Sequence, residues 1–205
     1  MSARSKPAKE EDVIEHPRLG RFYSCGLGWG QRINVPAFDA FCWPTKYHEP
    51  VNPAGRYGLA VCGTRYGAFP TAEGWKMVEQ VLKRPEQVVK LVVEALWNDF
   101  NGTGPDSGMW WHGNLSKVAQ YAKSAVPKLN SPEDLLGCLR LEGLALAYHF
   151  YSKPTPLIDL MFWPAFEYEH ALGVLTDGKR IVGIGYSLDV EPFKRKRRST
   201  QSRRA

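Results

Sequence analysis

Residues 163–186 read WPAFEYEHALGVLTDGKRIVGIGY, and this stretch gives the strongest signal for the fold. Asp177-Gly178 is a typical tight-turn pair, and apolar residues stand on both sides of it. Those that precede the turn are Leu172, Val174 and Leu175, and those that follow it are Ile181, Val182 and Ile184. The pattern predicts a β-hairpin in which two strands pair in an antiparallel arrangement.

Helix signals occupy the middle of the chain. The segment Pro70-Thr71-Ala72-Glu73 is typical of a helix start, with Thr71 as the capping residue. A second helix is expected to begin at Pro85 and to stop near Asn101. Because little sequence separates them, we expect the two helices to form an antiparallel helical hairpin.

Strand signals flank these helices on both sides. Apolar and aromatic runs of strand length lie between residues 16 and 63, and again between residues 143 and 163. The order of strands, helices and strands favours an α+β fold, with a largely antiparallel sheet packed against a central helical hairpin. We expect residues 1–12 to be a disordered N-terminal tail, residues 13–192 to form a single α+β domain, and residues 193–205 to be a disordered basic tail.

Composition and cysteine usage exclude several classes of protein. The chain of 205 residues is 43% hydrophobic and 23% charged, as in an ordinary globular protein, and it holds no apolar run long enough to cross a membrane. Its first residues lack an apolar secretory segment, so we expect a cytoplasmic protein. The four cysteines form no C-x-x-C pair; we expect reduced, mostly buried thiols, no metal and no cofactor.

The positive charge is concentrated in the last residues of the sequence. Residues 194–205 contain seven Lys and Arg residues and no acid, and without them the net charge changes from +6 to −1. The candidate nucleic-acid-binding residues are Lys194, Arg195, Lys196, Arg197 and Arg198. Such a run could contact phosphates, dock on an acidic protein or remain a solvated extension, and the sequence leaves these alternatives open.

Two short segments carry the candidate site residues. Trp110, Trp111 and His112 lie in an expected loop over residues 103–113, where an exposed aromatic side chain could contact a partner. The loop could instead fold back over the sheet. Nucleophile motifs such as G-x-S-x-G are missing from the sequence, so no catalytic residue is predicted.

The second segment contains Glu167, Glu169 and His170, the one tight cluster of acids and histidine. These residues could bind a partner, or form an acid–base or metal site if the segment is a turn on which they converge. On a strand, residues 167 and 169 would share one face. The structural alternative is that the cluster bonds to backbone groups and fixes the entrance of the hairpin.

Three motifs resemble a widespread bacterial domain family of unknown function, whose members often lie near toxin and immunity genes. The first, over residues 16–36, is a His-Pro-x-Leu-Gly opening strand followed by an aromatic strand that ends in proline. The second, over residues 70–100, is a Pro-Thr-x-Glu helix followed by a second apolar helix. The third, over residues 167–185, contains the Glu-His-x-x-Gly-Val hairpin, which ends in glycine. Ala171 departs from the family, in which glycine commonly follows the Glu-His pair.

The resemblance implies a non-enzymatic protein-binding module, specifically an immunity protein that neutralises a toxin. It implies another protein as partner, and the short apolar runs predict no membrane association. Two alternatives remain at this point: a nucleic-acid-associated protein acting through the basic tail, and a small metal-dependent or hydrolytic enzyme centred on Glu167, Glu169 and His170.

Overall fold

The computed structural model describes residues 13–25, 28–44, 53–64, 68–123, 125–150, 154–187 and 189–194. The predicted N-terminal tail (residues 1–12) and all of the basic tail beyond Lys194 lie outside the described residues. Of the candidate nucleic-acid-binding residues, only Lys194 is therefore described, and it is exposed.

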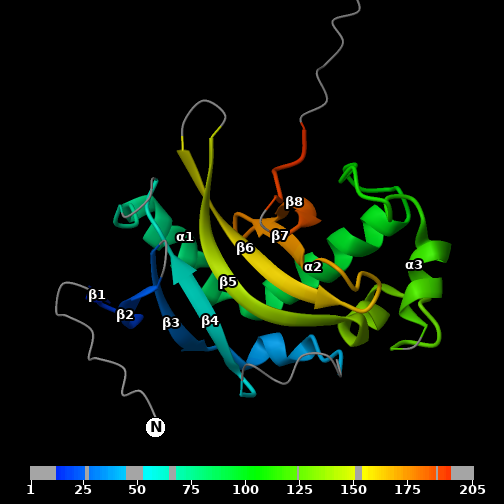
Figure 1. Cartoon of the computed structure of the whole chain (residues 1–205), viewed down its shortest axis with the longest axis horizontal. Helices are drawn as coiled ribbons and strands as arrows, with labels where there is room; N and C mark the ends of the chain where they lie inside the picture. The colour runs from blue at the N-terminus through cyan, green and yellow to red at the C-terminus, as the bar shows by residue number, and fades with distance from the viewer. Residues whose placement is uncertain are drawn as a thin grey trace, which may run out of the picture.

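One sheet of eight strands organises the described part of the chain, and its strands follow one another in sequence order (Figure 1). They are β1 (Val13–His16), β2 (Gly20–Cys25), β3 (Gly28–Asn34), β4 (Arg56–Val61), β5 (Leu139–Phe150), β6 (Pro154–Pro164), β7 (Leu172–Thr176) and β8 (Ile181–Tyr186). Neighbouring strands pair antiparallel except β4 and β5, which are parallel. The predicted α+β class with a largely antiparallel sheet is confirmed.

The parallel junction between β4 and β5 requires a long crossover, and the helices supply it. The crossover contains α1 (Ala72–Lys83), α2 (Pro85–Phe100), α3 (Leu115–Ala122) and the 3₁₀ helix η3 (Pro132–Cys138). A further 3₁₀ helix, η2 (Pro36–Ala40), follows β3. Thr71 caps α1 as predicted, because its hydroxyl accepts a hydrogen bond from the Gly74 amide at 3.1 Å.

The antiparallel pairing of α1 and α2 is not confirmed. Only Arg84 separates the two helices, and each packs mainly on other elements: α1 on β6, and α2 on η2, η3 and β8. In Figure 1 both helices lie behind the sheet. A single linking residue leaves no room for a loop that would bring the helices alongside each other, so they extend across the sheet one after the other.

The core lies between the sheet and these helices. Its largest completely buried side chains include Phe22, Phe38, Phe100, Trp111 and Phe162, which come from the sheet, η2, α2 and the loop before α3. A smaller cluster of Leu157, Leu175 and Val190 covers part of the opposite face of the sheet. We call residues 189–194 the C-terminal strap, because this segment returns over β7 and β8 after the last strand.

The predicted C-terminal hairpin is confirmed as β7 and β8. Gly178 has a φ of +77°, a left-handed conformation that favours glycine in the turn. The Asp177 carboxylate accepts hydrogen bonds from the amides of Lys179 and Arg180 at 2.9 and 3.0 Å. Gln80 on α1 donates to the Asp177 carbonyl at 3.0 Å, which fixes the hairpin turn against the helix layer.

Among the residues that the structure describes, no helix has the length and apolar character needed to cross a membrane.

Candidate functional site

The loop between α2 and α3 is held at both ends by one backbone carbonyl. The amides of Gly102 and Gly113 both donate to the Asp99 carbonyl, at 3.0 and 2.8 Å. Both glycines have positive φ, at +67° and +65°, and a Cβ atom on Gly102 would lie 3.2 Å from the Gly113 Cα. The two ends of the loop therefore meet in a contact that larger residues would disturb.

The Asp99 carboxylate organises the inside of this loop. It is 1% exposed, and its Oδ2 accepts hydrogen bonds from Trp111 Nε1 and from the Ser107 hydroxyl, both at 2.8 Å. His112 Nδ1 lies 2.6 Å from Asp99 Oδ1. A buried carboxylate with several donors is well compensated, so this group anchors the loop to the end of α2.

Asp99, His112 and Ser107 match a catalytic triad in composition but not in arrangement. Ser107 donates to the carboxylate, whereas a triad serine donates to the histidine. The second ring nitrogen of His112 lies 3.9 Å from Asp106 Oδ1. This arrangement stabilises the loop and does not activate the serine.

The segment around Glu167 is a turn, the conformation in which Glu167, Glu169 and His170 were expected to converge. Glu167 Oε2 accepts hydrogen bonds from Trp110 Nε1 at 3.3 Å and from the Tyr186 hydroxyl at 3.4 Å. Its Oε1 accepts the Glu169 amide at 3.0 Å and lies 3.6 Å from His170 Nδ1. Burial is the main cause that raises the pKa of Tyr186, and the Glu167 charge adds to it.

The structure brings the two predicted segments together. Trp110 joins them through its bond to Glu167, and the Trp111 ring packs against Phe166 and Tyr186, with ring centroids 5.7 and 6.0 Å apart. Trp111 is completely buried and Trp110 is partly buried, so the loop folds back onto the sheet as the second alternative proposed. Trp111 therefore presents no surface to a partner in this conformation, whereas Glu169 and His170 are exposed.

Two exposed tyrosines lie beside Glu169 and His170, and neither was predicted from the sequence as a site residue. Tyr121 on α3 is 49% exposed and Tyr168 is 56% exposed. The Tyr168 hydroxyl donates to the Tyr121 carbonyl at 3.2 Å, and the Tyr121 ring centroid lies 5.4 Å from that of Trp110. We call Tyr121, Tyr168, Glu169 and His170 the tyrosine surface. One signal could have indicated Tyr168, which stands between two acids in the sequence.

The cysteines differ from the prediction of mostly buried thiols. All four are free, but Cys25 and Cys42 are exposed and Cys62 is half-buried. Only Cys138 is buried, and burial raises its pKa to about 12. Within the described ranges, no group of three or more His, Cys, Asp and Glu side chains is placed to hold a metal ion.

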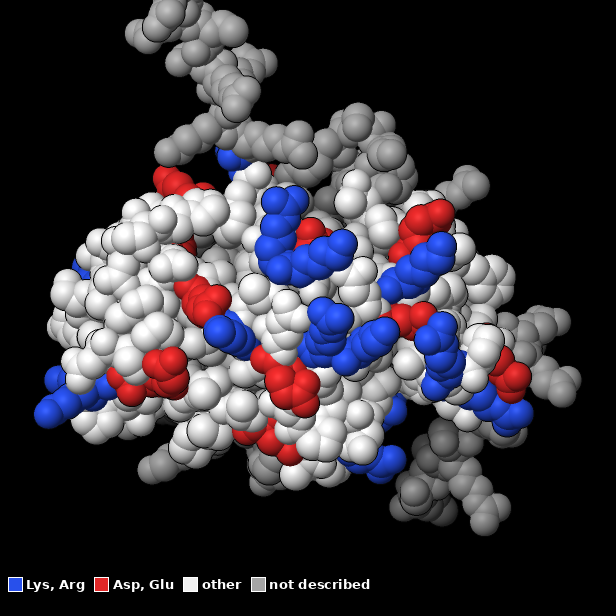
Figure 2. Space-filling view, turned by 180° about the vertical axis from the view of Figure 1, so that it is seen from behind, with Lys and Arg blue, Asp and Glu red and all other residues white. Residues whose placement is uncertain are grey.

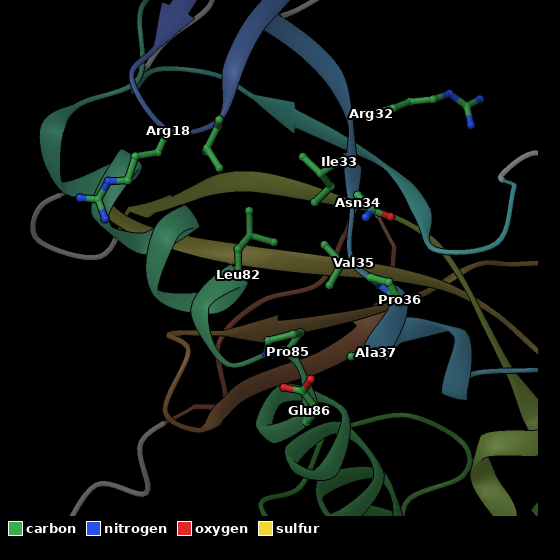
Figure 3. A pocket seen from close by; sticks show the side chains of 11 residues that line it. Arg18, Arg32, Ile33, Asn34, Val35, Pro36, Ala37, Leu82, Pro85 and Glu86 are labelled. Atoms are coloured by element: carbon green, nitrogen blue, oxygen red, sulfur yellow. The ribbon is translucent and has the colours of Figure 1, made fainter.

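A groove of about 540 Å³ is lined by none of the candidate site residues. It lies where the β1–β2 turn, the end of β3 and the α1–α2 junction meet (Figure 3). Its apolar lining includes Leu19, Ile33, Val35, Leu82 and Pro85. Arg18 and Arg32 stand at its margin and point away from it. Arg18 is paired with Glu79 at 3.1 Å.

Charged side chains of both signs share the face of the molecule that Figure 2 shows. Lys and Arg gather near its middle, and Asp and Glu lie among them. Paired charges occur among the described residues, since Lys90 and Glu94 on α2 lie 3.7 Å apart as an i, i+4 pair. Mixed charge of this kind is typical of a solvated surface and differs from the continuous basic face of many nucleic-acid-binding domains.

Comparison of the chain with models of protein families, with curated proteins and with solved structures found no match.

Proposed function

We propose that the chain is a non-enzymatic protein-binding module, and specifically an immunity protein that neutralises a toxin by binding to it. The observation that carries the binding proposal is the pair of exposed, adjacent tyrosines on the tyrosine surface. The immunity role follows from the family resemblance alone. Another protein is the proposed partner.

Exposed tyrosines in contact with each other are suited to protein recognition. A tyrosine offers a large apolar ring and a hydroxyl while losing little rotamer freedom on binding, and tyrosines are enriched among residues that dominate binding energy. Isolated exposed aromatics are common on protein surfaces, whereas adjacent ones form a patch.

Hydrogen bonds and ring contacts hold the residues beneath the tyrosine surface. Trp110 lies under Tyr121 and bonds to Glu167, and Asp99 holds the neighbouring Trp111 in the core. A surface that is already ordered before binding loses less conformational entropy when the complex forms. The buried residues of the loop thus serve to position the exposed ones.

The experiment compares wild type with the double variant Tyr121→Ala, Tyr168→Ala as bait in a pull-down from native cell lysate. The matched control is Tyr23→Ala, because Tyr23 is also exposed, at 51%, but lies on β2 near the other edge of the sheet. We expect one stoichiometric protein to be retained by wild type and control and reduced at least about tenfold by the double variant.

The immunity role has its own test. The retained protein is expressed alone and together with this chain, and we expect growth arrest in the first case and growth in the second. A partner that has no effect on growth would disprove the immunity role but leave protein binding intact. Equal retention of the partner by wild type and the double variant would disprove the tyrosine surface as the binding site.

The basic tail supports a second candidate function, association with nucleic acid. Its seven cationic residues would give an affinity that is insensitive to sequence and falls as salt increases. A version that ends at Phe193 lacks all seven and should lose this binding. The enzyme alternative gains no such support, because Glu167 is engaged by Trp110, Tyr186 and the Glu169 amide.

A further inference from the structure

A buried carboxyl group without a complete set of partners lies under the C-terminal strap. Asp159 on β6 is 8% exposed, and its Oδ1 has no hydrogen-bond partner among the described residues. A buried polar atom in this state costs stability, and the cost is much larger when the carboxyl is ionised than when it is neutral. Asp159 is the one buried side chain of the described part with such an orphan atom.

The strap is the element that covers this carboxyl. A Cβ atom on Gly173 would lie 2.8 Å from Val190 Cγ1 and 3.1 Å from Asp159 Oδ1, so these two side chains border the space above this glycine. Val190 also packs with Leu157 and Leu175 in the small cluster on this face. An apolar methyl group thus takes the place that water would occupy beside an ionised carboxylate.

Backbone hydrogen bonds and apolar side chains hold the strap in place, and Phe193 packs against the main core. The Phe193 amide donates to the Val182 carbonyl at 2.7 Å, and the Asp189 amide donates to the Tyr186 carbonyl at 3.2 Å. The first of these bonds covers a carbonyl of β8, the last strand of the sheet. Because the strap lies outside the eight strands, it can open while the strands beneath it stay paired.

We propose that the C-terminal strap is a proton-gated cover: it closes over Asp159 when the carboxyl is neutral and opens when the carboxyl ionises. On opening, the proton passes to solvent and the carboxylate becomes hydrated. Opening also uncovers Leu157, Leu175 and the Val182 carbonyl on β8, which gives the molecule a second surface, distinct from the tyrosine surface. This inference does not depend on the proposed function.

Asp159 is the ionisable group beneath the strap, because the described residues around it carry no ionisable side chain. Among the described residues, its strand partners Ala145 on β5 and Leu175 on β7 are not ionisable, and neither are Gly173 and Val190 beside its Oδ1. Asp189 and Glu191, which flank Val190, are exposed. Burial raises the pKa of Asp159 to about 6, and a hydrogen bond from the Val174 amide opposes this effect.

The test measures amide hydrogen exchange by NMR on the full chain, expressed as protection factors so that the intrinsic pH dependence of exchange is removed. If opening restores an ordinary carboxyl pKa, the protection of the Phe193 amide should fall about tenfold between about pH 5 and about pH 7.5. The amides of β6 serve as the reference for global unfolding. The Asp159→Asn variant, which cannot ionise, should show no such fall, and Asp189→Asn should retain it.

Three results would overturn the proposal. The first is equal protection of Phe193 at both pH values in wild type. The second is the same fall in Asp159→Asn as in wild type. The third is a protection of the Phe193 amide equal to that of the β6 amides at both pH values, which would show that the strap opens only when the whole domain unfolds.

Discussion

At the scale of single residues, Asp99 contributes most to the order of the candidate site. Its carboxylate accepts bonds from Trp111 and Ser107 and contacts His112, in a position that is 1% exposed. In Asp99→Asn the amide nitrogen would face at least one of these donors, so a buried bond is lost. We expect the free energy of unfolding to fall by about 2–4 kcal/mol in chemical denaturation followed by tryptophan fluorescence.

The matched control for this prediction is Asp106→Asn in the same loop. Asp106 is exposed and lies 3.9 Å from His112 Nε2, so its loss should change the free energy of unfolding by less than about 0.5 kcal/mol. Equal effects of the two variants would contradict the anchoring role of Asp99.

Asp159 makes a second prediction at this scale, and its sign follows from the direction of the pKa shift. The pKa of about 6 in the folded chain exceeds the ordinary value of 3.8, so the folded state holds the proton more tightly than the unfolded state. The stability of wild type relative to Asp159→Asn therefore falls as the pH rises from about 4 to about 6 and is constant above that range. At neutral pH the variant should be more stable by about 2–3 kcal/mol, and this gain should disappear near pH 4.

Denaturation curves of wild type and Asp159→Asn at several pH values measure this difference directly. Other carboxyl groups titrate in both proteins, so the difference between the two curves isolates Asp159. A difference that does not vary between about pH 4 and about pH 7 would refute the prediction.

Neither aspartate could be selected from the sequence. Asp99 ends an apolar helix face, where a carboxylate is more often solvated, and its donors come from a loop of irregular shape. Asp159 lies in a strand, and Val190, which borders the same space as its unpartnered oxygen, stands 31 positions later in the chain. Local periodicity carries no information about such distant packing.

At the scale of elements, the glycines of β7 and β8 decide whether the strap can lie on the sheet. A Cβ atom on Gly183 would collide with the Glu191 carbonyl, whereas a Cβ atom on Gly58 of β4 meets nothing within 4 Å. Gly183→Ala should therefore lift the strap and increase its cleavage in limited proteolysis, and Gly58→Ala should not. Equal cleavage of both variants would show that the glycine at 183 is not required for closure.

Elements with local signals were the ones that the sequence predicted correctly. The hairpin turn at Asp177-Gly178 and the Thr71 cap depend on residues within a few positions of each other, and both are present in the structure. Another local signal is present at Ser131, which precedes the 3₁₀ helix η3 and whose amide donates to the Asp134 carboxylate at 2.9 Å. The helical hairpin required knowledge of how α1 and α2 sit on the sheet, which no local pattern encodes.

At the scale of the whole molecule, the parallel pairing of β4 with β5 joins two antiparallel halves into one sheet. Gly58, Leu59 and Ala60 pair with Gly143, Leu144 and Ala145 across a separation of 85 residues. The candidate surface also forms at this scale, because α3, the loop before it and the segment after β6 meet only when the crossover is complete. The sequence indicated both segments as candidates, but their meeting depends on contacts more than 40 residues apart.

The C-terminal strap and the basic residues that follow Phe193 should contribute differently to the stability of the whole chain. A version that ends at Phe193 keeps the Phe193 amide bond and the Val190 contacts, and its net charge changes from +6 to −1. Its melting temperature should therefore match that of the full chain. A version that ends at Ser187 uncovers Leu157 and Leu175, and its free energy of unfolding should fall by about 2–4 kcal/mol. If the version that ends at Phe193 were as destabilised as the version that ends at Ser187, the residues beyond Phe193 would have to pack on the domain. If neither version were destabilised, the strap would contribute nothing to the stability of the folded state. Opening the strap would then cost too little free energy for the protonation of Asp159 to control it.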